Sequence, residues 1–114
     1  TGGDGAALCS GDMLLEALVA CAGVTLAAVA SSLGFKVEDA RLVAEGDIDF
    51  RGTLAVARDA PVGFKAIRLS FEIAGDLTDE QVATLIKLTE RYCVVLQTIR
   101  SAPSVTVTTT RAAA

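Results

Sequence analysis

The stretch that decides the fold is residues 13–30, which read MLLEALVACAGVTLAAVA. Only Glu16 and Thr25 interrupt this apolar run. Its length would suit a membrane span, but most of its apolar residues are small and the rest of the chain is an ordinary soluble mixture. We therefore interpret it as a central helix, fully buried in a globular fold or in a dimer. Ser10 or Asp12 could cap its start, and Gly34 suits the left-handed position that ends it.

Composition narrows the class of protein. The chain has 114 residues, which suits one domain, and 52% of them are hydrophobic, enough for a packed core. The net charge is −4, no basic run occurs and aromatic residues are few, so we expect binding neither to nucleic acid nor to a membrane surface. No charged segment precedes the first apolar run, so we expect no secretory signal and a cytoplasmic location.

Two strand patterns follow the apolar run. In residues 40–50, apolar or small residues fall on one face and mostly charged residues on the other, which is the period of a half-buried strand. Residues 65–73 show the same alternation, and the turn-like residues 58–63 lie between the two. The sequence therefore predicts an antiparallel hairpin. The predicted inward residues are Leu42, Ala44, Gly46, Ile48 and Phe50, then Ile67, Leu69, Phe71 and Ile73.

Two helices and a last strand complete the pattern. Thr78 and Gln81 fit a capping box, and an apolar stripe with helical spacing runs from there to Tyr92. Residues 93–99 predict a second short helix, and the valine- and threonine-rich residues 104–110 predict a strand. The fold class is therefore α+β, with a buried central helix on antiparallel sheet. Three strands would cover so apolar a helix poorly, so more strands or a second subunit are expected.

Cysteine is the main candidate for chemistry. The chain has no histidine, which removes the usual general base and the usual zinc ligand. Of three cysteines, Cys21 lies mid-helix, Cys93 lies near a helix start, and Cys9 lies in a Gly/Ala-rich loop and is interpreted as incidental. A helix dipole should favour the thiolate of Cys93. From the pattern alone, both Cys21 and Cys93 are more often plain core residues. No CxxC pair supports a metal site.

Several charged residues are weaker candidates. Glu16 interrupts the apolar helix and would need a partner or a raised pKa if buried. Arg91 could approach Cys93 but more simply is a solvated arginine. Glu45, Asp47 and Asp49 share one strand face, which is more often solvated than a cation site.

The two cysteine contexts resemble those of the OsmC/Ohr family of thiol peroxidases. Residues 10–23, SGDMLLEALVACAG, are similar to the family's central helix, in which an LLxALxxC run carries the reactive cysteine. Residues 90–95, ERYCVV, are similar to its second cysteine motif. The match continues between these two motifs, so the resemblance covers essentially the whole chain. The matching residues there are Leu33-Gly34, Glu38-Asp39-Ala40, Gly63-Phe64 and Ile73-Ala74-Gly75.

The resemblance implies an intertwined homodimer that reduces organic hydroperoxides in the response to oxidative stress. Cys21 would attack the peroxide and Cys93 would close a disulfide, which an external dithiol, of lipoyl type in one branch, would reduce. No metal or other cofactor is implied. A non-enzymatic member that binds a small hydrophobic ligand is the alternative, and a structural fragment is a third.

The chain departs from the family pattern in three places. The thiolate-activating arginine lies on N-terminal strands absent from this sequence, so we expect residues 1–114 to form a single OsmC-like domain that is incomplete at its N-terminus. The family's acid, ten residues before the reactive cysteine, is Gly11 here, and Asp12 is one position off. The proline that often follows the second cysteine is Val94.

Overall fold

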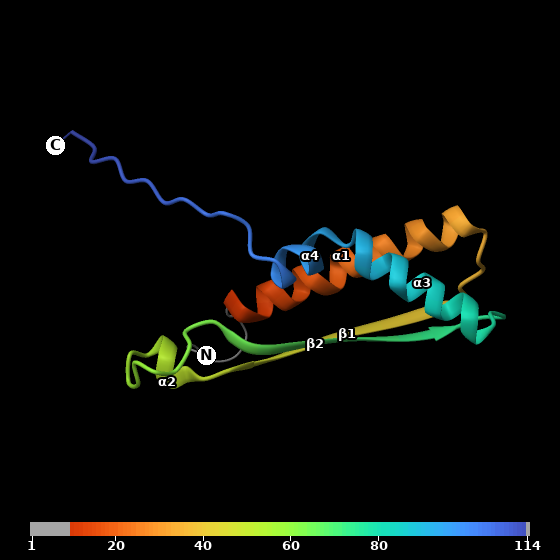
Figure 1. Cartoon of the computed structure of the whole chain (residues 1–114), viewed down its shortest axis with the longest axis horizontal. Helices are drawn as coiled ribbons and strands as arrows, with labels where there is room; N and C mark the ends of the chain where they lie inside the picture. The colour runs from red at the N-terminus through yellow and green to blue at the C-terminus, as the bar shows by residue number, and fades with distance from the viewer. Residues whose placement is uncertain (1–9, 114) are drawn as a thin grey trace.

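The computed structural model describes residues 10–113. In chain order the elements are α1 (Ser10–Leu33), β1 (Asp39–Ile48), α2 (Phe50–Thr53), β2 (Phe64–Ala74), α3 (Asp79–Tyr92) and α4 (Val94–Arg100). Figure 1 shows α1, α3 and α4 on one side of a long β1–β2 hairpin, with α2 at the hairpin's tip. The predicted α+β class is therefore confirmed, with one helical layer on one antiparallel sheet.

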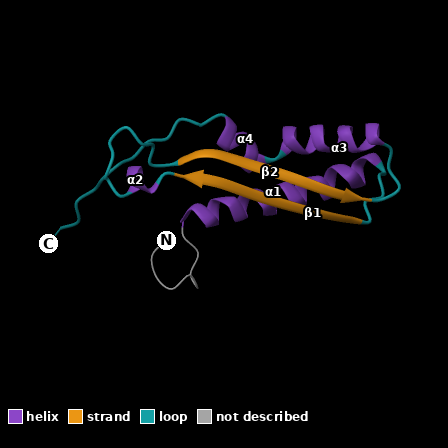
Figure 2. Cartoon of the chain, turned by 90° about the horizontal axis from the view of Figure 1, so that it is seen from below, coloured by secondary structure: helices purple, strands orange, loops and turns teal. Residues whose placement is uncertain are grey.

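The sheet is the hairpin that the alternating pattern predicted. Strands β1 and β2 pair antiparallel from Asp39 opposite Ala74 to Ile48 opposite Phe64, and Figure 2 shows them side by side with the helices behind. Burial alternates along β1 as predicted. Phe50 is a correction, because β1 ends at Ile48 and the Asp49 side chain accepts a hydrogen bond from the Arg51 N–H and so caps α2. Phe50 therefore begins a helix instead of extending the strand.

The helical layer packs on the sheet through one face of α1. The residues of α1 that are fully buried recur every fourth position, which is one stripe of a helix. They are Leu18, Ala22, Leu26 and Ala30. The N-terminal part of this stripe packs against Leu96 of α4, and its C-terminal part packs against Leu85 of α3. The capping box at Thr78 and Gln81 is present as predicted, and Gly34 has the expected positive φ of 70° after α1. Ser10 and Asp12 are both helical residues of α1.

The expectation that the central helix is fully buried is wrong for the single chain. Val24 is 72% exposed and Met13 59% exposed. By length and composition alone α1 could cross a membrane, and 22% of its most apolar window is buried. The reason is geometric: the hairpin, α3 and α4 cover only part of the helix circumference, and the described chain supplies no other cover.

The predicted strand at residues 104–110 is also a correction. This segment follows α4, carries no assigned strand and extends away from the body (Figure 1). Val105 is 76% exposed and Val107 is 87% exposed. A strand needs a neighbour to accept and donate its backbone hydrogen bonds, and within residues 10–113 this segment has none.

Candidate active site

Two elements bring the predicted cysteines to one place. Cys21 is half-buried at the middle of α1, and Cys93 is fully buried between α3 and α4. The Cys93 backbone is extended, with φ −75° and ψ 110°. Its N–H still donates to Thr89 O at 3.0 Å, and its carbonyl already accepts from Gln97 N at 3.0 Å. This single residue thus ends one helix and starts the next, so the first N–H groups of α4 are free of helical partners.

The two thiols lie in contact although 72 positions separate them (93 − 21 = 72). Cys21 packs against the cluster that holds Leu18, Ala22, Cys93 and Leu96. The two thiols are close enough to shift each other's pKa, and both cysteines are free. The sequence could name both residues from their motifs, but their contact is a result of the tertiary fold.

Hydrogen-bond donors surround the Cys21 sulfur. The Val95 N–H makes the largest contribution and lowers the pKa of the Cys21 thiol. Burial opposes this effect by disfavouring the charged form, while the Cys93 thiol, the Val94 N–H and the Thr25 hydroxyl lower the pKa further. Donors directed at a sulfur stabilise its thiolate, and the thiolate is the nucleophilic form. Cys21 therefore has the electrostatic environment of a reactive thiol.

Cys93 has the opposite character. Burial raises the pKa of the Cys93 thiol, and the neighbouring Cys21 sulfur raises it further, whereas the Leu96 N–H acts against them. The expectation that the start of α4 favours the Cys93 thiolate is therefore wrong. The free N–H groups of Val94 and Val95 point to Cys21, so the helix end stabilises the thiolate of the other cysteine.

Thr25 is a site residue that the sequence analysis missed. Its hydroxyl donates to the Cys21 carbonyl at 2.8 Å and also reaches the Cys21 sulfur. The signal was present in the sequence, because residues four apart on a helix are neighbours. Thr25 stood out only as an interruption of an apolar run.

The other charged candidates do not reach the thiols. Glu16 is exposed, and the Arg91 guanidinium lies 5.4 Å from the ring centre of Tyr92. Nine residues of helix, about 13 Å of rise, separate Asp12 from Cys21, so Asp12 does not touch the sulfur.

The acidic residues Glu45 and Asp47 on β1, and Asp49 just after it, are ion-paired. Arg68 pairs with Glu45 and Asp47, and Arg51 pairs with Asp49. Within residues 10–113 no group of three His, Cys, Asp or Glu side chains could hold a metal ion. Cys9 lies outside the described residues.

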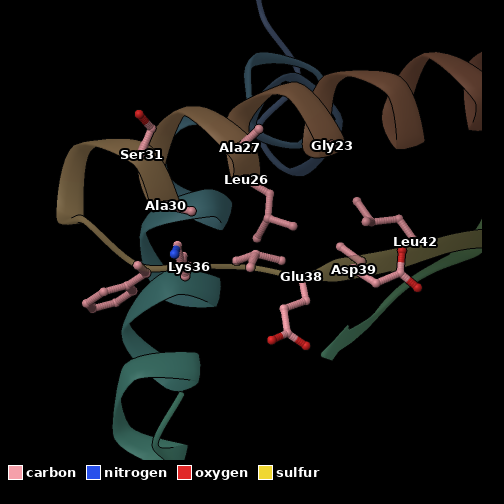
Figure 3. Close-up of a pocket in the computed structure, with 12 residues that line it drawn as sticks. Gly23, Leu26, Ala27, Ala30, Ser31, Lys36, Glu38, Asp39 and Leu42 are labelled. Carbon is pink, nitrogen blue, oxygen red and sulfur yellow. The ribbon is translucent and has the colours of Figure 1, made fainter. Parts of the chain in front are cut away.

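Several hollows with apolar linings flank α1, and two of them border its C-terminal half. One, of about 560 Å³, runs between α1 and α3 and is lined by Thr25, Val29, Leu88 and Tyr92 among others, so it borders Cys21 through Thr25. The other, of about 550 Å³, lies between the C-terminal half of α1 and the start of β1 and includes neither described cysteine. Figure 3 shows Leu26 extending from α1 into this second cavity, while the Glu38 carboxylate points away from α1.

Comparison with known proteins supports the family and the fold. A sequence profile of the family described as OsmC-like protein matches residues 2–108. A solved structure from Legionella pneumophila, described as an organic hydroperoxide resistance protein OsmC, a predicted redox protein and a regulator of sulfide bond formation, is similar with a TM-score of 0.68 and 22% sequence identity. The match covers 88% of this chain and 67% of that one. No curated protein matches significantly. The chain belongs to the OsmC-like protein family.

Proposed function

We propose that this protein is a thiol peroxidase that reduces organic hydroperoxides, with Cys21 as the nucleophile and Cys93 as the resolving cysteine. Family membership and the Legionella pneumophila relative support a redox-related role. The observation that carries the proposal is the contact between two free thiols whose surroundings shift their pKa values in opposite directions. One thiol is thereby prepared to attack and its neighbour is kept protonated.

The first step uses both sulfurs. The Cys21 thiolate attacks the terminal oxygen of the hydroperoxide, the O–O bond breaks, and Cys21 becomes a sulfenic acid. The leaving alkoxide takes the proton of the Cys93 thiol, which packs beside the reacting sulfur, and departs as an alcohol. This transfer leaves Cys93 as a thiolate beside the new sulfenic acid.

The second step closes the disulfide. The Cys93 thiolate attacks the sulfur of the Cys21 sulfenic acid, and hydroxide leaves as water after taking a proton from solvent. The sum is two thiols and one hydroperoxide giving one disulfide, one alcohol and one water. An external dithiol, such as a lipoyl group, then reduces the disulfide by thiol–disulfide exchange. Because both described cysteines are free, we propose a reducing, cytoplasmic location.

The test is peroxide turnover with a defined reductant. Loss of cumene hydroperoxide is followed with dihydrolipoamide for the wild type, for Cys21→Ser and for Cys9→Ser as a matched cysteine control. We expect turnover in the wild type and in Cys9→Ser, and none in Cys21→Ser because the nucleophile is absent. Equal rates for the wild type and Cys21→Ser would reject Cys21 as the nucleophile.

We further propose that the active form is a homodimer. The single chain exposes 8489 Å², whereas a compact chain of 11.7 kDa exposes about 5,900 Å². Its radius of gyration is 18.3 Å, against about 13 Å for a compact chain of this length. The exposed part of α1 around Met13 and residues 104–110 are the surfaces that a second copy would cover, with the valines of that segment pairing as a strand.

Light scattering after size-exclusion chromatography tests the dimer. The wild type should run at twice the chain mass, and Val107→Asp should shift the equilibrium towards monomer because it buries a charge in the proposed interface. A wild-type monomer at micromolar concentration would contradict the proposal.

The cavity between α1 and β1 favours a second candidate function, the binding of a small apolar ligand. Its volume of about 550 Å³ falls within the usual range for small-molecule sites, and its lining residues include neither Cys21 nor Cys93. Binding of an apolar fluorescent dye to the wild type and to Ala27→Trp, which fills the cavity, tests this function. Weaker dye binding in Ala27→Trp with unchanged peroxide turnover would show that the ligand and the peroxide bind at different places. Equal dye binding in both proteins would show that the cavity is not the ligand site.

A further inference from the structure

The hydroxyl of Thr25 has two acceptors and one hydrogen. It donates to the Cys21 carbonyl at 2.8 Å, a bond between residues four apart on α1, and the Cys21 sulfur lies within its reach. The carbonyl is already the natural acceptor for the N–H of the same residue four positions on, as in any helix. The hydroxyl can therefore leave the carbonyl without creating an unsatisfied group.

Ionisation of Cys21 changes which acceptor is better. A neutral thiol sulfur is a weak acceptor, whereas hydrogen bonds to charged groups are roughly twice as strong as neutral ones. The hydroxyl should thus prefer the carbonyl beside the thiol and the sulfur beside the thiolate. A threonine on a helix has two accessible rotamers for this purpose.

Thr25 also lines the hollow between α1 and α3. Its hydroxyl therefore lies at the boundary between the Cys21 sulfur and the apolar surface of Val29, Leu88 and Tyr92. A hydroperoxide that enters along this hollow would meet the hydroxyl and the sulfur together.

We propose that Thr25 is a further catalytic residue, whose hydroxyl turns from the Cys21 carbonyl to the Cys21 sulfur as the thiol ionises and holds the thiolate towards the hollow between α1 and α3. This inference rests on the proposed role of Cys21 as nucleophile. The other groups around the sulfur act from different elements: the N–H groups of Val94 and Val95 from α4, and the Cys93 thiol from the α3–α4 junction.

Charged side chains on the packed elements are directed elsewhere. Glu90 of α3 and Arg100 of α4 pair with each other at 2.8 Å. The charged residues of β1 fall on the exposed face of the sheet. Cys93 is therefore the titratable group to consider with Cys21 when a pH profile is interpreted.

The test is the rate of Cys21 alkylation as a function of pH. Iodoacetamide labelling is followed by mass spectrometry of the Cys21 peptide, so labelling of Cys9 or Cys93 does not interfere. Thr25→Val keeps the branched shape but removes the hydroxyl, and we expect its midpoint to rise by about 0.3 pH unit, which is about twofold slower labelling below the midpoint. Thr25→Ser keeps the hydroxyl and should label like the wild type.

Thr98→Val is the matched control, because Thr98 makes the same backward bond, to Val94 O at 2.8 Å, from an exposed position on α4. It should leave the midpoint unchanged. A Thr25→Val midpoint equal to that of the wild type, or a Thr25→Ser midpoint shifted as far as that of Thr25→Val, would overturn the inference. If Thr25→Val does not fold, Thr25→Ala replaces it under the same criteria.

The same measurement separates this inference from the proposed function. If the wild-type midpoint is lowered but Thr25→Val has no effect on it, only the role of Thr25 is rejected. An ordinary wild-type midpoint near 8.5 would remove the activated Cys21 on which the peroxidase proposal rests.

Discussion

The thiol cluster and the hairpin tip contain similar apolar residues, but these residues are buried in the cluster and exposed at the tip. The thiol cluster, formed by Leu18, Cys21, Ala22, Cys93 and Leu96, lies where α1 and α4 pack on the sheet. The hairpin tip, residues 49–63, contains α2 and a loop. Leu18 is fully buried in the first, whereas Leu54 is 69% exposed in the second.

The difference shows what each region uses to hold its shape. The thiol cluster buries Cys93 fully and Cys21 by about half. Burial raises the pKa of Cys93, whereas the N–H groups of α4 lower that of Cys21. The hairpin tip is held by polar contacts at the surface, such as the pair Arg51–Asp49 at 2.6 Å. The paired thiols therefore depend on convergent packing, whereas the tip changes the ionisation of a side chain through a surface ion pair, as at Asp49.

The largest expected effect comes from Cys93→Ser, which would separate the two chemical steps within the thiol cluster. The variant should still consume one equivalent of hydroperoxide per chain, because Cys21 is intact and serine can still donate a hydrogen bond. Catalytic turnover should fall by more than about 100-fold, since the sulfenic acid has no resolving thiol. Rapid-quench measurement of peroxide consumption checks both numbers. Sustained turnover would mean that Cys93 does not resolve the intermediate.

Leu18→Ala should distinguish the two regions by stability. Removing a fully buried leucine side chain leaves a cavity and costs about 2–5 kcal/mol of unfolding free energy. Leu54→Ala, the matched change at the hairpin tip, should stay within about 0.5 kcal/mol. Urea unfolding followed by circular dichroism gives both values. Equal losses would show that the tip is buried in the working assembly and would break the comparison.

Val94→Pro measures how much the Val94 N–H lowers the pKa of the Cys21 thiol. Proline lacks an N–H but is well tolerated at the first position of a helix, and the extended backbone of Cys93 suits a residue before proline. The Cys21 alkylation midpoint should rise by less than about half a pH unit, because the larger contribution from Val95 remains. Val94→Ala keeps the N–H and should show no shift. A rise above a full unit in Val94→Pro would point to displacement of α4.

The smallest effect is expected at the hairpin tip, from Asp49. The Arg51 side chain and N–H lower the pKa of the Asp49 carboxyl to about 2. A depressed carboxyl pKa stabilises the fold above the unfolded value of about 3.9, and this contribution is lost as the pH falls through about 2. The difference in melting temperature between the wild type and Asp49→Asn should therefore shrink as the pH falls from 4 towards 2. Arg51→Gln should reduce the same pH dependence, and a constant difference would contradict the assignment.

Local patterns predicted the elements that have local causes. Alternation gave the β1–β2 hairpin, and the capping box gave the start of α3. The strand at residues 104–110 failed because valine and threonine describe a preference for a pleated surface, whereas a strand forms only with a partner. Part of α1 stays exposed in the single chain for a similar reason: an apolar helix predicts burial but does not specify whether the chain's own elements or a second copy cover it.

The site was predictable as far as its two cysteines and no further. Motif resemblance pointed to Cys21 and Cys93, but the direction of each pKa shift depends on burial and on where the N–H groups of Val94 and Val95 point. Those are properties of the packing of α4 against α1. Thr25 was closer to being predictable than these pKa shifts. Its spacing of four residues from Cys21 was visible in the sequence, and only the position of its hydroxyl required the structure.

The central claim is that Cys21 and Cys93 form one redox pair, and peptide mapping after mild oxidation tests it most directly. The protein is treated with one equivalent of cumene hydroperoxide without reductant, digested and analysed by mass spectrometry. The account predicts a Cys21–Cys93 disulfide as the main product, reversed by dihydrolipoamide. A persistent Cys21 sulfenic or sulfinic acid with Cys93 still reduced, or a disulfide that involves Cys9 in its place, would contradict it.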